Sequence, residues 1–173
     1  MPESEVHATS LVRQLTLLLN SKLTLVNAPG IIDNVNVKEV ILSANYMQAV
    51  LRLFSQINVA YVGIGAPTKD SVVMRDGAIM SQADLDALLK KGAVGDIALR
   101  FFDIEGQPVI SELDARVIGI SLEQVKKIPR VVGVAGGPQK HEVVCAALKG
   151  GFIDVLITDE QTARFVLEKA PAC

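Results

Sequence analysis

The sequence predicts an α/β fold in which helices flank a mostly parallel sheet, and three observations support this prediction. The composition is 50% hydrophobic but only 4% aromatic, without tryptophan, a balance typical of strands that helices bury on both faces. Short apolar runs end in glycine-containing turns, which is the pattern of buried strands. The last third of the chain alternates strand, helix, strand and helix, the order of right-handed crossovers in a parallel sheet.

The first third of the chain is mostly helical by pattern. A helix is expected from Ser4 to about Lys22, because apolar residues recur there every three or four positions. The alternating stretch from Lys22 to Asn27 predicts a short strand, with Asn27 at its carboxyl end. Residues 35–56 predict two further helical pieces, which Asn45 separates or caps.

A buried strand and an irregular loop follow. Residues 58–65 form a continuous apolar run that ends with Gly63 and Gly65, as expected of a strand whose tip approaches a ligand or another backbone. Residues 66–80 are polar and predict an irregular loop.

The middle of the chain predicts a helix and then a strand that turns back. The helix begins after Ser81, which can cap it, and ends at Gly92. Residues 96–103 predict the strand, followed by a hairpin partner near Val109 and a further short strand at residues 117–120.

The remaining elements are the alternating ones. We expect a short helix over residues 121–127, a buried strand over 130–135, a helix after the turn at 136–140, a strand over 152–158 and a final helix over 159–169.

The length and charge of the chain exclude several classes of protein. The 173 residues favour one domain. The net charge of −2 lacks the basic excess of a nucleic-acid binder, so we expect no direct DNA binding by this chain. The start is unlike a signal peptide and no apolar run approaches membrane-spanning length, which predicts a cytoplasmic protein. Cys145 and Cys173 have no metal-ligand spacing, and we expect neither a metal nor a cofactor.

The strongest local signal is the turn that contains Gly136, Gly137 and Lys140, between a predicted strand and a predicted helix. Glycines there leave backbone N–H groups free at the positive end of a helix, an arrangement that suits phosphate. A lysine in the first helical turn is mildly unfavourable, and a bound anion would remove the conflict. The alternative is a solvated lysine after an ordinary turn.

Other candidate residues lie at predicted strand ends and in the irregular loop. Gly63 and Gly65 end one strand, and open parallel sheets bind ligands at the carboxyl ends of their strands. Asp96 could accept hydrogen bonds from sugar hydroxyls, or it could serve only a turn. Arg75 could close over a phosphate or an acidic group, or be a free surface arginine. Asn27 completes the set of candidate ligand-binding residues, and we assign none to catalysis.

A family resemblance rests on four stretches in a fixed order. Together they resemble the effector-binding domain of SorC/DeoR-type bacterial sugar-responsive transcriptional regulators, and the stretches are residues 92–106, 116–122, 128–140 and 150–160. The resemblance implies a fold related to glucosamine-phosphate deaminase and ribose-phosphate isomerase, without catalysis. It also implies that Lys140 contacts the phosphate of a sugar, that Asp96 holds sugar hydroxyls and that Arg75 helps close the site.

The resemblance also defines what the chain is expected to lack and to do. Residues 1–173 correspond to a single effector-binding domain without the helix-turn-helix and without the first part of the effector domain. The expected function is to sense a phosphorylated sugar and to couple it to DNA binding through a homo-oligomer, a dimer or tetramer. The alternatives are a phosphosugar isomerase or deaminase, which needs a general base such as Asp96, and a degenerate fragment that mediates only oligomer contacts.

Overall fold

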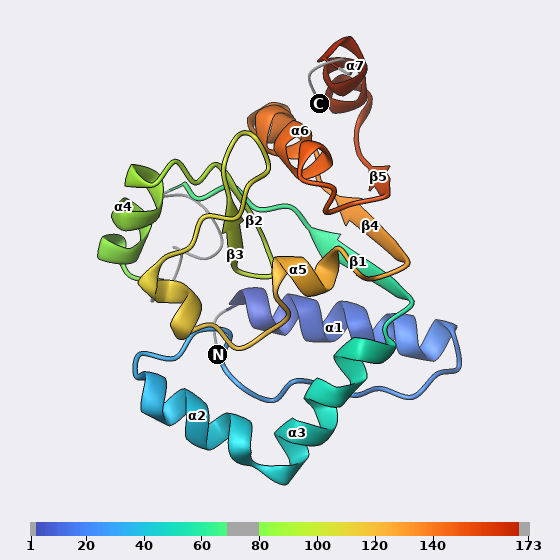
Figure 1. Cartoon of the computed structure of the whole chain (residues 1–173). Coiled ribbons are helices and arrows are strands. Elements are labelled where there is room, and N and C mark those ends of the chain that lie inside the picture. Colours follow the sequence, from blue (N-terminus) through green and yellow to red (C-terminus); the bar gives the residue numbers. More distant parts are fainter. Residues whose placement is uncertain (1–2, 69–79, 170–173) are drawn as a thin grey trace.

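The computed structural model describes residues 3–68 and 80–169 (Figure 1). The first third is helical, as predicted, and ends in a 3₁₀ turn; its elements are α1 (Glu3–Leu18), α2 (Val35–Ser43), α3 (Asn45–Arg52) and η1 (Leu53–Gln56). The side chain of Asn34 caps α2 by accepting a hydrogen bond from the Asn36 N–H at 2.8 Å. None of the described helices is long and apolar enough to cross a membrane.

The strand predicted at residues 22–27 is wrong. This segment is irregular, and none of the described strands pairs with it. The hydroxyl of Tyr46 in α3 donates to the Leu25 carbonyl instead. An alternating pattern therefore did not suffice without a neighbouring strand to supply hydrogen bonds.

Three parallel strands form the main sheet and confirm the predicted α/β class. Their order is β1–β4–β5, with β1 at Val59–Gly63, β4 at Arg130–Val134 and β5 at Val155–Ile157. Gly63 pairs with Val134, and Val134 pairs with Ile157. The carboxyl ends of all three strands therefore lie at one edge of the sheet.

Helices connect and flank these strands. The chain passes from β4 through η3 (Pro138–Lys140) into α6 (His141–Lys149), and from β5 into α7 (Glu160–Lys169), while α5 (Leu122–Val125) precedes β4. Ser121 begins α5 with a reciprocal cap, because its hydroxyl accepts from the Gln124 N–H and the Gln124 side chain accepts from the Ser121 N–H. These helices confirm the predictions for the C-terminal third.

The single strand predicted at residues 96–103 is in fact a hairpin. Strands β2 (Gly95–Ile97) and β3 (Arg100–Phe102) pair antiparallel, and the chain reverses at Ala98 and Leu99, whose φ angles are 52° and 63°. A carboxylate oxygen of Asp96 accepts from the Leu99 N–H at 3.2 Å and supports the turn. The sequence lacks the Asn-Gly or Asp-Gly pair that normally marks such a turn, so its pattern did not indicate the reversal.

The elements around the hairpin agree with the sequence in part. Helix α4 (Gln82–Lys90) begins after Ser81, which caps it as predicted. The Val109 N–H donates to the Phe101 carbonyl at 2.9 Å, so the expected partner of the hairpin is present as a short pairing. The short strand expected at residues 117–120 is reduced to one bridge between Ile31 and Val117, after the 3₁₀ turn η2 (Glu112–Ala115).

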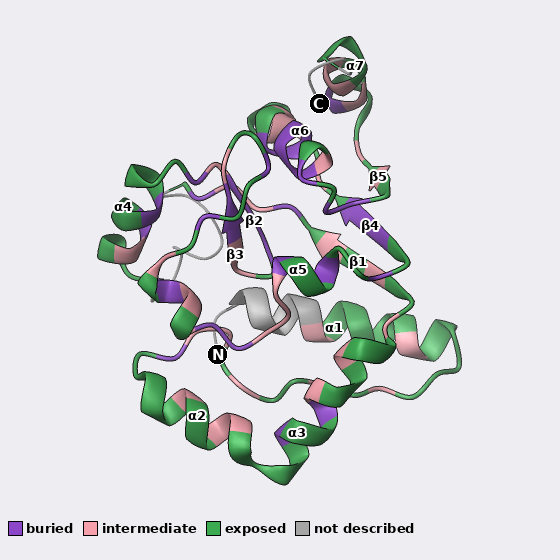
Figure 2. Cartoon of the chain, viewed as in Figure 1, coloured by how far each residue is buried: buried purple, intermediate pink, exposed green. Residues whose placement is uncertain are grey.

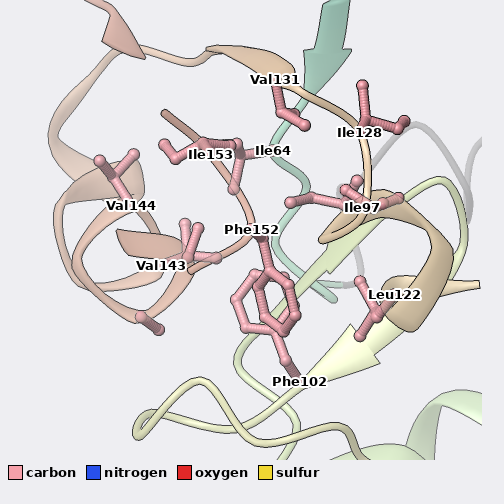
Figure 3. Close-up of a cluster of buried hydrophobic side chains, with 13 residues drawn as sticks. Ile64, Ile97, Phe102, Leu122, Ile128, Val131, Val143, Val144, Phe152 and Ile153 are labelled. Carbon is pink, nitrogen blue, oxygen red and sulfur yellow. The ribbon is translucent and has the colours of Figure 1, made fainter. Parts of the chain in front are cut away.

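The main core lies between the sheet, α5, α6 and the hairpin (Figure 2). The rings of Phe102 and Phe152 lie against each other (Figure 3), with centroids 5.2 Å apart and ring planes tilted by 42°. Ile64 and Ile153 belong to the same cluster, lie side by side (Figure 3), and are both buried. Ile64 follows β1 directly, so its packing in the core holds the backbone in place at the end of this strand.

Candidate functional site

The end of β1 is joined to the hairpin through Gly65 and Asp96. The Gly65 N–H donates to the Asp96 carbonyl at 2.9 Å, and the Asp96 N–H donates to the Gly65 carbonyl at 3.0 Å. A β-carbon on Gly65 would lie 1.9 Å from a carboxylate oxygen of Asp96. Only glycine fits there, so the predicted close approach of the strand tip to another backbone is found, and it brings the carboxyl group to the strand ends.

The side chain of Lys140 also reaches the end of β1. Its Nζ donates to the Ile64 carbonyl at 2.9 Å, and its backbone N–H donates to the Gly137 carbonyl at 2.9 Å. Because the Ile64 side chain is buried in the core, the acceptor of the ammonium group is held in a fixed position. Lys140 is therefore not a freely solvated lysine.

Burial controls the electrostatics of this pair. It raises the pKa of Asp96 to about 6, although the Leu99 N–H and the Lys140 cation act in the opposite direction. Burial also lowers the pKa of Lys140, against the attraction of Asp96. Both groups have lost more hydration than they regain from each other. A polar ligand that hydrogen-bonds to either group would replace part of that hydration.

The Gly136–Gly137 turn completes the strand-end region. Gly137 has φ 98° and ψ 154°, a conformation that only glycine adopts readily. Its N–H donates to a carboxylate oxygen of Asp159 at 2.6 Å. A β-carbon on Gly136 would lie 2.6 Å from the same oxygen. The turn thus packs against the residue that precedes α7.

The structure gathers six of the eight predicted ligand residues around the strand ends: Gly63, Gly65, Asp96, Gly136, Gly137 and Lys140. Asn27 lies elsewhere. It lines a hollow of about 560 Å³ between residues 22–27 and α3, and this hollow contains none of the other predicted residues. Arg75 lies outside the described residues, so its proposed role stays a prediction.

Two residues near the site were not predicted. Asp159 comes directly after the strand predicted over residues 152–158. Its place at a predicted strand end is the signal by which Gly63 and Gly65 became candidates, so the same signal could have identified Asp159. His141 follows Lys140, and its ring stacks on Phe165 of α7 with centroids 4.6 Å apart. Its Nε2 is buried and finds no hydrogen-bond partner among the described residues. The stacking and burial of His141 depend on how α6 packs against α7, and the sequence pattern does not reveal this packing.

The arrangement suits binding of a ligand that carries both negative charge and hydroxyl groups. A lysine and a glycine turn offer donors to an anion, and a carboxyl group next to them offers an acceptor to hydroxyls. No group of three or more histidine, cysteine or acidic side chains in the described part of the chain has the arrangement of a metal site.

Comparison with known families and proteins gives a consistent result. The family described as "Putative sugar-binding domain" matches residues 2–168. The transcriptional regulator LsrR of Klebsiella pneumoniae subsp. pneumoniae is 35% identical over 150 residues, which are 85% of this chain and 46% of the relative. The deoxyribonucleoside regulator of Bacillus subtilis is 35% identical over 136 residues, 79% of this chain and 43% of the relative. The chain thus spans less than half the length of these curated relatives.

Solved structures show the same fold. A transcriptional regulator from Streptococcus pneumoniae superposes with a TM-score of 0.85 at 29% identity, over 94% of this chain and 62% of that chain. The full-length sorbitol operon regulator SorC from Klebsiella pneumoniae superposes with a TM-score of 0.78 at 27% identity, over 86% of this chain and 47% of that chain.

Proposed function

Because this chain belongs to the sugar-binding domain family of SorC-type transcriptional regulators, we propose that it senses a phosphorylated sugar. The observation that carries the proposal is the convergence of Lys140 and the Gly136–Gly137 turn at the strand ends, beside Asp96. A phosphate and a set of sugar hydroxyls are the ligand groups that these residues recognise best.

Each residue has a separate task in this proposal. Lys140 leaves the Ile64 carbonyl or shares its ammonium protons with the phosphate. Asp96 accepts hydrogen bonds from sugar hydroxyls, which also restores polar contacts to a buried carboxyl group. Arg75, which lies outside the described residues, closes over the ligand.

The proposal extends from binding to regulation. The ligand shifts an equilibrium between oligomeric states, a dimer or tetramer, and this changes DNA binding by the regulator in the cytoplasm. The chain acts as a sensor and not as an enzyme. In support, the two carboxyl groups that the described residues bring to the strand ends are Asp96 and Asp159, and the Asp159 carboxylate is already occupied by hydrogen bonds from Gly137 and Thr162. Isomerases or deaminases of sugar phosphates need an acid and a base in position.

A screen of hexose and pentose phosphates by thermal shift tests the ligand class. A ligand present at 100 times its dissociation constant stabilises the folded chain by about 2.7 kcal/mol. Each unphosphorylated sugar serves as the control for its phosphate. A shift with the free sugars alone would reject the phosphate, and turnover of a probe would reject the sensor role.

The variant Lys140→Ala tests the site itself. We expect the best ligand of the screen to lose about tenfold to a hundredfold in affinity, because a charge-assisted contact contributes roughly 1.5–3 kcal/mol. The stability without ligand should change by less than about 1 kcal/mol, since a lost hydrogen bond is offset by removal of a poorly hydrated charge.

A matched control for that variant is Lys149→Ala at the other end of α6, where the lysine pairs with Glu105 at 3.4 Å. Isothermal titration of both variants should show a loss of affinity for Lys140→Ala alone. Equal affinities of Lys140→Ala and the original chain would exclude Lys140 as the phosphate contact.

A further inference from the structure

Asp159 connects the Gly136–Gly137 turn to the C-terminal helix. It lies between β5 and α7, and its carboxylate accepts three hydrogen bonds. One comes from the Gly137 N–H at 2.6 Å. The other two come from Thr162, from its backbone N–H at 2.9 Å and from its hydroxyl at 2.9 Å. The two oxygens are divided, since Oδ1 accepts the Thr162 N–H and Oδ2 accepts the other two donors.

These bonds keep the carboxylate charged. They lower the pKa of Asp159 to about 2, with the Thr162 N–H as the largest cause and the Gly137 N–H as the next. Thr162 itself is fully buried, so one end of the contact is anchored inside the protein. An exposed aspartate without such donors would move freely in solvent, whereas Asp159 has a single defined position.

The fixed carboxylate determines the shape of the turn. It holds the Gly137 N–H, and it lies against Gly136 on the side where another residue would carry its β-carbon. The Gly136 N–H has no hydrogen-bond partner among the described residues. This donor therefore stays available in the same turn as Lys140, while the neighbouring Gly137 N–H is occupied.

We propose that Asp159 is the positioning residue of the anion site, which holds the Gly136–Gly137 turn so that the Gly136 N–H and Lys140 serve one anion. The inference rests on the proposed function, because it assumes that an anion binds there. It assigns Asp159 no contact with the ligand. A carboxylate near an anion is tolerable here because three donors already surround it.

Two variants separate the positioning role from the stability of α7. Asp159→Ser keeps a side-chain oxygen that can cap the helix at the Thr162 N–H, but a single short oxygen cannot also hold the Gly137 N–H. Thr162→Val has nearly the same shape as the original residue and removes only the hydroxyl bond, so Asp159 keeps its bond to Gly137. The first variant releases the turn, and the second weakens the helix end alone.

The experiment uses inorganic phosphate as the probe, titrated by ³¹P NMR, together with hydrogen exchange of the assigned Gly137 amide. For Asp159→Ser we expect exchange at Gly137 to become about tenfold faster and phosphate to bind about tenfold more weakly, since one fixed hydrogen bond is lost. For Thr162→Val we expect both quantities to stay within about twofold of the original chain.

Other results would overturn the inference. Unchanged phosphate affinity in Asp159→Ser would make Asp159 a helix cap only, and tighter binding would mean that the carboxylate competes with the anion. An equal loss of affinity in both variants would assign the effect to α7. Failure of the original chain to bind phosphate would overturn the proposed function as well, whereas binding that Asp159→Ser leaves intact overturns this inference alone.

Discussion

The described residues 59–68 and 80–169 form strands and helices around a large core, whereas the described residues 9–56 contain only helices and a 3₁₀ turn as regular elements, with few buried side chains. Thirteen buried side chains from the sheet, the hairpin, α5, α6 and the segments that adjoin them form one apolar cluster. Among the described side chains of residues 9–56, only Ile32, Met47 and Val50 are buried. Several leucines of α1 are exposed, including Leu18 at 83%. A helical pattern thus produced helices in both regions, but burial differs greatly between them.

The two regions are joined mainly through one loop. The Ile32 N–H donates to the Arg116 carbonyl at 3.0 Å, and the Ile118 N–H donates to the Gly30 carbonyl at 2.9 Å. Lys38 adds a bond from its Nζ to the Ala115 carbonyl at 2.8 Å. The buried cluster of Ile32, Met47 and Ile118 accompanies these bonds but is much smaller than the main core. The N-terminal helices should therefore open at a lower free energy than the sheet. The strand-end site belongs to the stable region, as a preorganised binding site requires.

The largest expected difference between the regions comes from removing one side chain in each. Phe152 is fully buried against Phe102, so Phe152→Ala should lower the free energy of unfolding by about 3–5 kcal/mol. Leu18→Ala in α1 should change it by less than about 0.5 kcal/mol, as for other exposed positions. Urea unfolding followed by circular dichroism measures both. Comparable losses would mean that α1 is part of the cooperative core.

A smaller effect concerns the pH dependence of the packed region. The folded chain keeps Asp96 protonated up to about pH 6, whereas the unfolded chain ionises it near its ordinary pKa of 3.8. The unfolded state therefore binds fewer protons in this window, and stability falls as pH rises from about 4 to about 6. A shift of about two units corresponds to about 3 kcal/mol.

The variant Asp96→Asn isolates that contribution, because an amide does not titrate. The difference in unfolding free energy between the variant and the original chain should grow in favour of the variant from pH 4 to pH 6, and then level off. Measurements on the chain without ligand avoid any contribution from sugar binding. A difference that stays constant over this range would show that folding does not raise the pKa of Asp96.

The same contrast explains how much the sequence could predict. Strands β1 and β4 are continuous apolar runs, and the Ser81 and Ser121 caps are local signals, so their positions were predicted correctly. The predicted burial holds for β4 but is wrong for β1, which lies at the edge of the sheet and alternates between exposed and half-buried residues. The segment at residues 22–27 has a strand pattern but no pairing partner, and pairing is not local information. The Gly136–Gly137 turn before a predicted helix supplied the hypothesis for Lys140, and the family resemblance added to it. Its contact with the Ile64 carbonyl, however, joins residues 76 positions apart and requires the folded sheet.

The smallest predicted effect tests the tight turn of the hairpin within the stable region. Ala98 is exposed and has a φ of 52°, which costs a non-glycine residue about 1–2 kcal/mol. Ala98→Gly removes that strain but makes the unfolded chain more flexible, by about 0.4–1 kcal/mol. The net result should be a gain of up to about 1.6 kcal/mol. Gly92→Ala provides the opposite change, because Gly92 has a φ of 83° and open space around its β-carbon position. The backbone strain costs about 1–2 kcal/mol, and the stiffer unfolded chain offsets about 0.4–1 kcal/mol of it, so stability should fall by up to about 1.6 kcal/mol. Urea unfolding of both variants must therefore give effects of opposite sign, and a loss of stability in Ala98→Gly would show that the turn is not strained.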